Sequence, residues 1–204
     1  MKFYSYVIPR DYGFAPNPYF GYCTLATCKQ RIRKSACVGD WIGAFGSAKM
    51  AIRGRLVALM LVDEILTFDE YWEDPRFRNK RPIFNKSVMF MYGDNIYHTS
   101  DGEWMQEPSH HSKTDGTINY INLNRDTQAD RVLVATEFYY FGENAISVPT
   151  IFNPLIWRHI GYKICDDDLL VGKFVQYIRQ HYDSGIYGTP YSRKKGEFMH
   201  YGGK

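Results

Sequence analysis

The chain lacks the sequence signatures of the best-known nucleotide enzymes, and it lacks long apolar segments. Its 204 residues contain no GxxxxGK[ST] phosphate loop, no HExxH zinc motif, no GxSxG nucleophile elbow and no HxE motif followed by PCxxC. No run reaches the ~18 apolar residues expected of a membrane span. The first apolar run breaks at Pro9-Arg10, so we expect no signal peptide and a cytoplasmic protein.

The chain has few cysteines, and their spacing does not suit a structural metal site. Cys23, Cys28, Cys37 and Cys165 form neither a CxxC pair nor a cluster with histidines. We therefore expect reduced thiols, no metal and no cofactor. Two interpretations remain for Cys23 and Cys28: buried free thiols, which are the commoner case, or a nucleophile with a distant histidine as its base.

The chain also has no large excess of charge of one sign. A net charge of +3 says little about a nucleic-acid partner, so local clusters must carry that argument. Aromatic residues are plentiful instead, at 17% of the chain, which favours strands and binding surfaces over helical bundles. The length fits one domain, which we predict over residues 1–182, followed by an extended tail over 183–204.

Hydrophobic patterns predict several strands, few helices and no βαβ alternation. Strands are expected over residues 2–9, 41–45, 55–66 and 131–141, and helices over 23–36, 67–72 and 167–181. The polar stretch 99–130 contains aromatic and histidine residues, which indicates an ordered loop with a function. The predicted fold class is α+β, a small mixed or antiparallel β-barrel with a few peripheral helices.

Five short segments carry a resemblance to a known family. They are Arg10–Pro18, Cys23–Lys29, Gly39–Trp41, Gly93–His98 and Phe138–Gly142. On these segments, at least residues 1–149 resemble the nucleotide modification associated domain 2 family of bacteria and phages. The resemblance implies a place in systems that make, recognise or restrict modified nucleotides. A weaker similarity to PUA-like and EVE-type barrels, through Gly39–Trp41, implies a reader that holds a flipped or modified base in an aromatic pocket.

The loop from Asp11 to Pro18 is the first candidate binding site. Asp11 and Asn17 offer hydrogen bonds to a base edge, and an aromatic ring beside them offers stacking worth ~1–3 kcal/mol per base. The alternative is a structural turn with buried aromatics. The predicted ligand-binding residues are Asp11, Tyr12, Phe14, Asn17, Thr24, Lys29, Trp41, Ser47 and Tyr97.

Two basic clusters are candidates for contacts with nucleic acid. The first comprises Arg31, Arg33 and Lys34, and the second comprises Arg76, Arg78, Lys80 and Arg81. The second is interleaved with phenylalanines, and cations mixed with rings suit single-stranded or flipped-out nucleic acid. The alternative for each cluster is an ordinary solvated face.

Histidines and carboxylates between residues 94 and 115 form the candidate catalytic set. Its members are Asp94, Tyr97, His98, His110, His111 and Asp115, of which Asp94, His98 and His111 are the catalytic candidates. The adjacent histidines cannot both face one metal from a regular helix or strand, because neighbouring side chains diverge. Hydrogen-bonded structural roles are the alternative.

The preferred interpretation is a nucleotide or nucleic-acid binding module that recognises a modified base without transforming it. The base pocket is predicted between the Asp11–Asn17 loop, Trp41–Ser47 and Asp94–His98. One alternative is an enzyme of nucleotide or base modification that uses Asp11 or Asp94 with His98 or His111 as acid and base. A second alternative is a protein-interaction module whose tyrosines form the interface.

Overall fold

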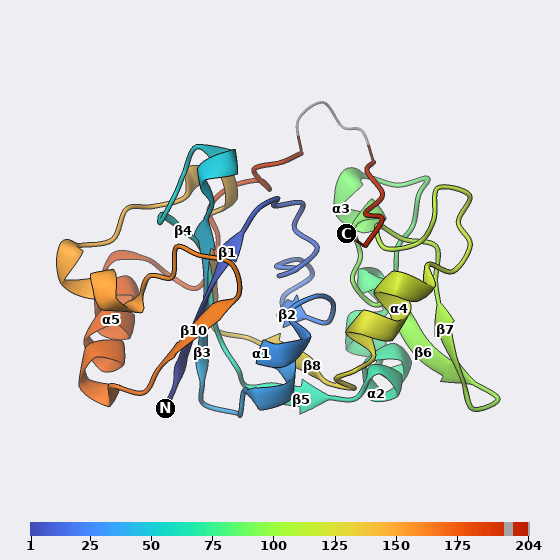
Figure 1. Cartoon of the computed structure of the whole chain (residues 1–204), viewed down its shortest axis with the longest axis horizontal. Helices are drawn as coiled ribbons and strands as arrows, with labels where there is room; N and C mark the ends of the chain where they lie inside the picture. The colour runs from blue at the N-terminus through green and yellow to red at the C-terminus, as the bar shows by residue number, and fades with distance from the viewer. Residues whose placement is uncertain (194–197, 204) are drawn as a thin grey trace. The chain divides into compact units, whose positions relative to one another are not determined.

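The computed structural model describes residues 1–193 and 198–203, which divide into two compact units (Figure 1). Unit 1 consists of Met1–Tyr12, Ala36–Asp63 and Ala135–Arg193. Unit 2 consists of Gly13–Ser35, Glu64–Val134 and the described part of Lys194–Lys204. Among the described residues, no helix combines the length and the apolar character needed to cross a bilayer.

Unit 1 is an open six-stranded mixed sheet. Its strand order is β10-β1-β3-β4-β9-β11, and β1 lies parallel to β3. The strands are β1 (Phe3–Ile8), β3 (Trp41–Gly46), β4 (Leu56–Leu61), β9 (Phe138–Tyr140), β10 (Tyr162–Cys165) and β11 (Gly185–Ile186). Short 3-10 helices complete the unit: η1 (Ala48–Met50), η3 (Gly142–Asn144) and η4 (Thr150–Leu155). The predicted strands 2–9 and 41–45 are confirmed as β1 and β3. The single strand predicted over 55–66 divides into β4 and β5 (Glu64–Leu66), which belong to different sheets.

Helix α5 (Asp168–His181) supplies the second layer of unit 1 (Figure 1). Asp167 caps it by accepting a hydrogen bond from the N–H of Leu170 (3.0 Å), so the predicted helix 167–181 is confirmed. Its apolar stripe is buried in the same core as the sheet, and the ring of Phe174 meets the ring of Phe3 edge-on at 5.5 Å. The core of this unit therefore lies between a sheet and a helix.

The predicted barrel, and with it the PUA-like architecture, is wrong. The outer strands β10 and β11 of unit 1 each pair with a single neighbour, and no sheet of the described residues closes. Closure requires those two outer strands to pair with each other, and they do not. The protein has a mixed α/β fold with open sheets.

Unit 2 surrounds a small sheet with short helices and a hairpin. The sheet has the order β2-β8-β5, and β6 pairs with β7 as the hairpin. Its strands are β2 (Cys23–Leu25), β5 (Glu64–Leu66), β6 (Tyr97–Ser100), β7 (Glu103–Gln106) and β8 (Val132–Ala135). Its helices are α1 (Gln30–Ser35), α2 (Phe68–Glu73), η2 (Pro75–Lys80), α3 (Val88–Met91) and α4 (Tyr120–Asp126).

Local sequence patterns predict only part of the secondary structure of unit 2. The capping box at Thr67 and Glu70 is present, as the sequence predicts. The predicted helix over 23–36 is wrong in its first half, because Cys23–Leu25 is a strand and the helix begins only at Gln30. The predicted strand over 131–141 divides into β8 and β9, which belong to different sheets.

Candidate active site

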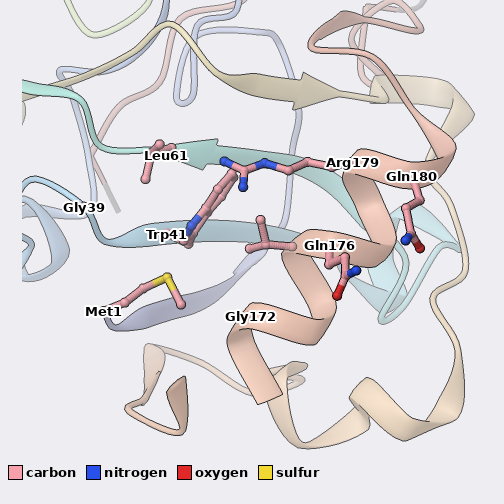
Figure 2. A pocket seen from close by; sticks show the side chains of 9 residues that line it. Met1, Gly39, Trp41, Leu61, Gly172, Gln176, Arg179 and Gln180 are labelled. Carbon is pink, nitrogen blue, oxygen red and sulfur yellow. The ribbon is translucent and has the colours of Figure 1, made fainter. Parts of the chain in front are cut away.

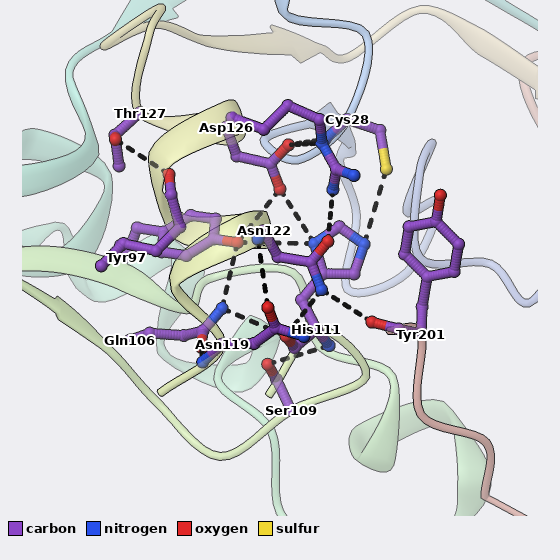
Figure 3. Close-up of polar contacts among 12 residues, drawn as sticks. Cys28, Tyr97, Gln106, Ser109, His111, Asn119, Asn122, Asp126, Thr127 and Tyr201 are labelled. Carbon is purple, nitrogen blue, oxygen red and sulfur yellow. Dashed lines mark hydrogen bonds and ion pairs between the residues drawn. The ribbon is translucent and has the colours of Figure 1, made fainter. Parts of the chain in front are cut away.

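Three side chains of unit 2 lie in a line that ends at a partly exposed thiol. Nε2 of His111 lies 3.6 Å from Sγ of Cys28, and Nδ1 of the same ring lies 2.8 Å from Oδ2 of Asp126 (Figure 3). His111 and Asp126 are buried, whereas Cys28 is only half-buried. The order of thiol, imidazole and carboxylate is that of a nucleophile, its base and the group that orients the base. We call these three residues the Cys28 relay.

The backbone that presents Cys28 is strained. Cys28 and Lys29 lie between β2 and α1, and their φ angles of 56° and 40° are both left-handed. Left-handed residues other than glycine cost free energy and cluster at functional sites. Two hydrogen bonds hold the turn: the N–H of Cys28 donates to Oδ1 of Asp126 (3.1 Å), and Nε of Arg33 donates to the carbonyl oxygen of Cys28 (2.9 Å).

Neighbouring polar side chains fix the backbone of His111. Its carbonyl oxygen accepts hydrogen bonds from Nδ2 of Asn122 (2.8 Å) and Nε2 of Gln106 (3.3 Å). Its N–H donates to Oγ of Ser109 (3.3 Å). The imidazole is therefore held with one nitrogen toward each partner, which defines the path of a proton between Sγ and the ring.

Asp126 ends helix α4 and accepts hydrogen bonds on both carboxylate oxygens. The hydroxyl of Tyr97 donates to Oδ2 (3.0 Å), and Nε of Arg125 donates to Oδ1 (3.1 Å). The buried guanidinium of Arg33 donates to the backbone carbonyl oxygen of the same residue. A buried carboxylate with this many donors is stabilised in its ionised form.

The charges of the relay favour a thiolate beside an imidazolium. Burial opposes ionisation of Cys28, but the charge and hydrogen bond of His111 outweigh it and lower the pKa of the thiol. Burial also opposes protonation of His111, but the charges of Cys28 and Asp126 raise its pKa to about 9. For Asp126, burial is outweighed by His111 and by two arginines, which lower the carboxyl pKa to about 2. The direction of these shifts is that expected of a reactive cysteine beside a histidine.

The same three residues bring one sulfur, one nitrogen and one oxygen ligand within 4.8 Å of one another, as a metal site would. The two ring nitrogens of His111 face different partners, however. A metal on Nε2 would have Cys28 and His111 as direct ligands and Asp126 only behind the ring. Two protein ligands are fewer than the three or four that zinc takes in proteins, so the geometry suits proton transfer better than chelation.

Comparison with known proteins adds one decisive match. The model of the nucleotide modification associated domain 2 family matches residues 1–197 of this chain. The chain belongs to this family. Neither the curated proteins nor the solved structures contain a match. Membership places this nucleotide modification associated domain in the general context of nucleotide modification. The type of chemistry must be inferred from its residues.

A second polar cluster of this nucleotide modification associated domain is entirely buried in unit 2. Nζ of Lys80 donates to O and Oδ1 of Asn17 (3.0 and 2.9 Å), and Asp94 accepts from the hydroxyls of Thr24 (2.7 Å) and Tyr71 (2.9 Å). Burial lowers the pKa of Lys80 to about 8 and raises that of Asp94 to about 6. We call these five residues the Lys80 network. The side chains of Asn17, Thr24 and Asp94, predicted to meet a base, make internal hydrogen bonds here.

The predicted base pocket combines residues of both units, and it stays a prediction. In unit 1, the carboxylate of Asp11 accepts from the hydroxyl of Tyr140 (2.6 Å) and the N–H of Tyr191 (3.1 Å). Tyr12 accepts a hydrogen bond on its carbonyl oxygen from Arg193, and Ser47 caps η1. Phe14, Lys29 and Tyr97 lie in unit 2.

Trp41 belongs to a different surface feature of unit 1. It lines a depression of about 540 Å³ together with Leu61, Val175 and Arg179 (Figure 2). The guanidinium of Arg179 lies 5.6 Å from the Trp41 ring and pairs with Glu137 at 2.6 Å. Trp41 itself is 2% exposed, so it offers little surface to a ligand.

The basic clusters separate into structural and exposed members. Arg33 and Lys80 are buried, and Arg81 lies over the ring of Trp72 at 3.5 Å. Arg76 pairs with Glu64 (3.0 Å) and Asp74 (2.6 Å). The exposed members are Arg31, Lys34, Arg76 and Arg78.

The catalytic candidates are likewise separated. His111 joins the relay, Asp94 joins the Lys80 network, and His98 stacks on Trp72 at 4.1 Å while contacting Glu107 (3.0 Å). Sequence reasoning missed Asp126, which no local motif marks. The one signal that included it was the long polar stretch 99–130, which is ordered as the hairpin β6–β7 and helix α4.

Proposed function

We propose that this domain is a nucleotide-modifying enzyme in which Cys28 is the covalent nucleophile. His111 is its acid–base partner, and Asp126 positions His111. The observation that carries the proposal is the Cys28 relay, in which each nitrogen of one buried imidazole faces one partner. The left-handed backbone at Cys28 and the lowered pKa of its thiol support the same assignment.

The hydrogen bond donated by the backbone N–H of Cys28 helps to define the type of reaction. In acyl-transferring triads the N–H of the nucleophile helps to bind the oxyanion. Here that N–H donates to Oδ1 of Asp126. This favours a reaction in which negative charge develops away from the nucleophile, as it does when a thiolate adds to an unsaturated ring. A pyrimidine base offers such an acceptor at C6.

The proposed step is addition followed by elimination, without an oxidant or a reductant. Sγ of Cys28 forms a bond to C6 of the pyrimidine, and the electron pair of the C5–C6 double bond moves toward the carbonyl at C4. C5 then takes up a proton, supplied through Nε2 of His111. Loss of a proton from C5 and cleavage of the C–S bond restore the base and the thiolate. The activated C5 is where a modification is introduced.

Two measurements test this proposal. In D₂O, the intact chain should exchange the C5 proton of pyrimidine nucleoside monophosphates, as followed by NMR, and Cys28→Ala should not. The rate of Cys28 alkylation by iodoacetamide, read by peptide mass spectrometry, should titrate below the ordinary thiol pKa of about 8.5. Asp126→Asn should move that titration upward, because it weakens the stabilisation of the imidazolium. An ordinary Cys28 titration together with no exchange would refute the proposal.

Recognition of a modified base without chemistry is the second candidate. It is supported by the rings around His111, since Phe14 lies 4.7 Å and Tyr201 5.5 Å from the imidazole. Aromatic rings clustered in this way suit a base that is bound outside a duplex. A reader should retain its affinity for modified nucleotides in Cys28→Ala and release them unchanged, whereas an enzyme should convert or exchange them.

A further inference from the structure

The C-terminal segment of unit 2, residues 198–203, covers the Cys28 relay. The N–H of Tyr201 donates to the carbonyl oxygen of His110 (2.7 Å), and Nδ2 of Asn122 donates to the carbonyl oxygen of Tyr201 (2.7 Å). The N–H of Met199 donates to the hydroxyl of Tyr92 (2.9 Å). These contacts run directly over the loop that carries His111.

The ring of Tyr201 lies against the relay itself. Its centroid is 5.5 Å from the His111 ring, and the guanidinium of Arg125 lies 5.5 Å from the same centroid. Figure 3 shows this ring beside the pair formed by Cys28 and His111. His111 is 1% exposed, so a substrate that reaches Nε2 must displace a neighbour.

We propose that residues 198–203 form a displaceable cover and that the Tyr201 ring occupies the position in which the substrate base stacks. This inference rests on the proposed function of Cys28. The Tyr201 ring lies near an imidazole and an arginine, and a base can use the same neighbours, because aromatic rings pack against one another and cations attract their faces. The phenol ring thus marks the base subsite of the same active centre.

The segment can separate from unit 2 without breaking a helix or a strand pairing. The described residues 198–203 belong to no helix or strand, and they are joined to unit 2 by hydrogen bonds at Met199, His200 and Tyr201 and by ring contacts of Phe198 and Tyr201. Segments with this character open at free energies well below that of global unfolding. Asn122 also holds the carbonyl oxygen of His111 through its Nδ2, so the relay keeps its own support when the cover leaves.

Removal of the cover should accelerate reactions at Cys28. If the cover is open about one tenth of the time, its removal raises the apparent rate about tenfold. The test compares the full chain with a chain ending at residue 197 and with Tyr201→Ala, which removes the ring but retains the backbone hydrogen bonds. Alkylation of Cys28 by iodoacetamide is measured by peptide mass spectrometry, with exposed Cys37 as the internal reference.

Two control variants sharpen the comparison. Tyr201→Phe retains the ring and should leave the rate unchanged, and Tyr120→Ala removes a 61% exposed ring elsewhere in unit 2 and should also have no effect. The affinity for uridine 5′-monophosphate should rise in the truncated chain and in Tyr201→Ala. Equal rates of Cys28 alkylation and equal affinities in all variants would refute the cover. If the Cys28 pKa were low in those variants, the proposed nucleophile would still stand. An ordinary Cys28 pKa in every variant would refute the proposed function itself.

Discussion

The Cys28 relay and the Lys80 network are built from similar residues in the same unit, yet they differ in where they end. The relay runs from a buried carboxylate through a buried imidazole to Cys28, a residue of intermediate burial. All five members of the Lys80 network are buried, and their hydrogen bonds go to one another and to the backbone. The proposed reactive site thus ends at a residue that is only partly buried, whereas the charges of the Lys80 network lie wholly in the interior and serve structure.

The two cysteines nearest to these clusters show the same contrast. Burial raises the pKa of Cys23 to about 12, despite the opposing charge of Lys80. The pKa of Cys28 is lowered, because His111 lies in direct contact with its sulfur. A matched pair of thiols five residues apart therefore separates the effect of burial from that of an adjacent cation.

Removing the nucleophile should have the largest effect. We expect Cys28→Ala to lower pyrimidine C5 exchange by about 10³-fold or more, as loss of a covalent nucleophile does in triad enzymes. Cys37→Ala is the matched control, since it removes an exposed thiol of unit 1 and should retain full exchange. NMR in D₂O provides both exchange rates. Equal rates in the two variants would show that Cys28 has no role in exchange that Cys37 lacks.

Breaking the second cluster should affect stability instead of chemistry. Lys80→Met removes the ammonium that donates to O and Oδ1 of Asn17 and to the carbonyl oxygen of Tyr22, and a hydrogen bond to a charged group contributes about 1.5–3 kcal/mol. We expect the free energy of unfolding to fall by about 3 kcal/mol in urea titrations, with an unchanged alkylation profile of Cys28 in the folded protein. A shifted Cys28 profile at full stability would show that the two clusters are not independent.

The pH dependence of stability should identify Asp94. Its folded-state pKa is raised to about 6, so its favourable contribution is complete below the unfolded value near 3.8 and is lost as pH rises through about 6. This loss amounts to about 2–3 kcal/mol by linkage. Asp94→Asn cannot ionise, so its stability relative to the natural chain should increase between pH 4 and pH 7. Urea unfolding at four pH values within this range measures the difference, and parallel curves would contradict it.

Tyr97→Phe should produce the smallest change. It removes one of the donors to Oδ2 of Asp126 while the bond from His111 remains. We expect a loss of about 1 kcal/mol in the free energy of unfolding and a small upward shift of the His111 pKa, because the carboxylate charge becomes less delocalised over donors. Two-dimensional NMR of the imidazole would detect that shift. A loss of activity as large as that of Cys28→Ala would place Tyr97 in the chemistry itself.

Local structure could be predicted from the sequence where one element carried its own signal. A short run that is apolar on both faces except at Ser5 predicted β1, and the capping residues Thr67 and Asp167 marked the beginnings of α2 and α5. Closure of the sheet could not be predicted in this way, because it depends on pairing between strands that are distant in the chain. The barrel was inferred from strand content alone, and the two-residue β11 at the sheet edge contradicts it.

The site was predictable only in part for the same reason. His111 was a catalytic candidate, and Cys28 was considered as a nucleophile with a distant histidine, but the commoner role of a buried thiol was preferred. Asp126 lies 98 residues from Cys28, and no spacing rule joins residues so far apart. The tertiary structure brings them together through the turn at Cys28 and the end of α4.

The lowered pKa of the Cys28 thiol has a consequence for oxidative conditions. A thiol with a lowered pKa reacts with peroxide faster than ordinary thiols and forms a sulfenic acid. Cys23, its nearest cysteine in sequence, is held as a fully buried neutral thiol and is poorly suited to form a protective disulfide with it. If Cys28 acts as proposed, the redox state of the surrounding solution therefore influences the fraction of chains that hold a usable nucleophile.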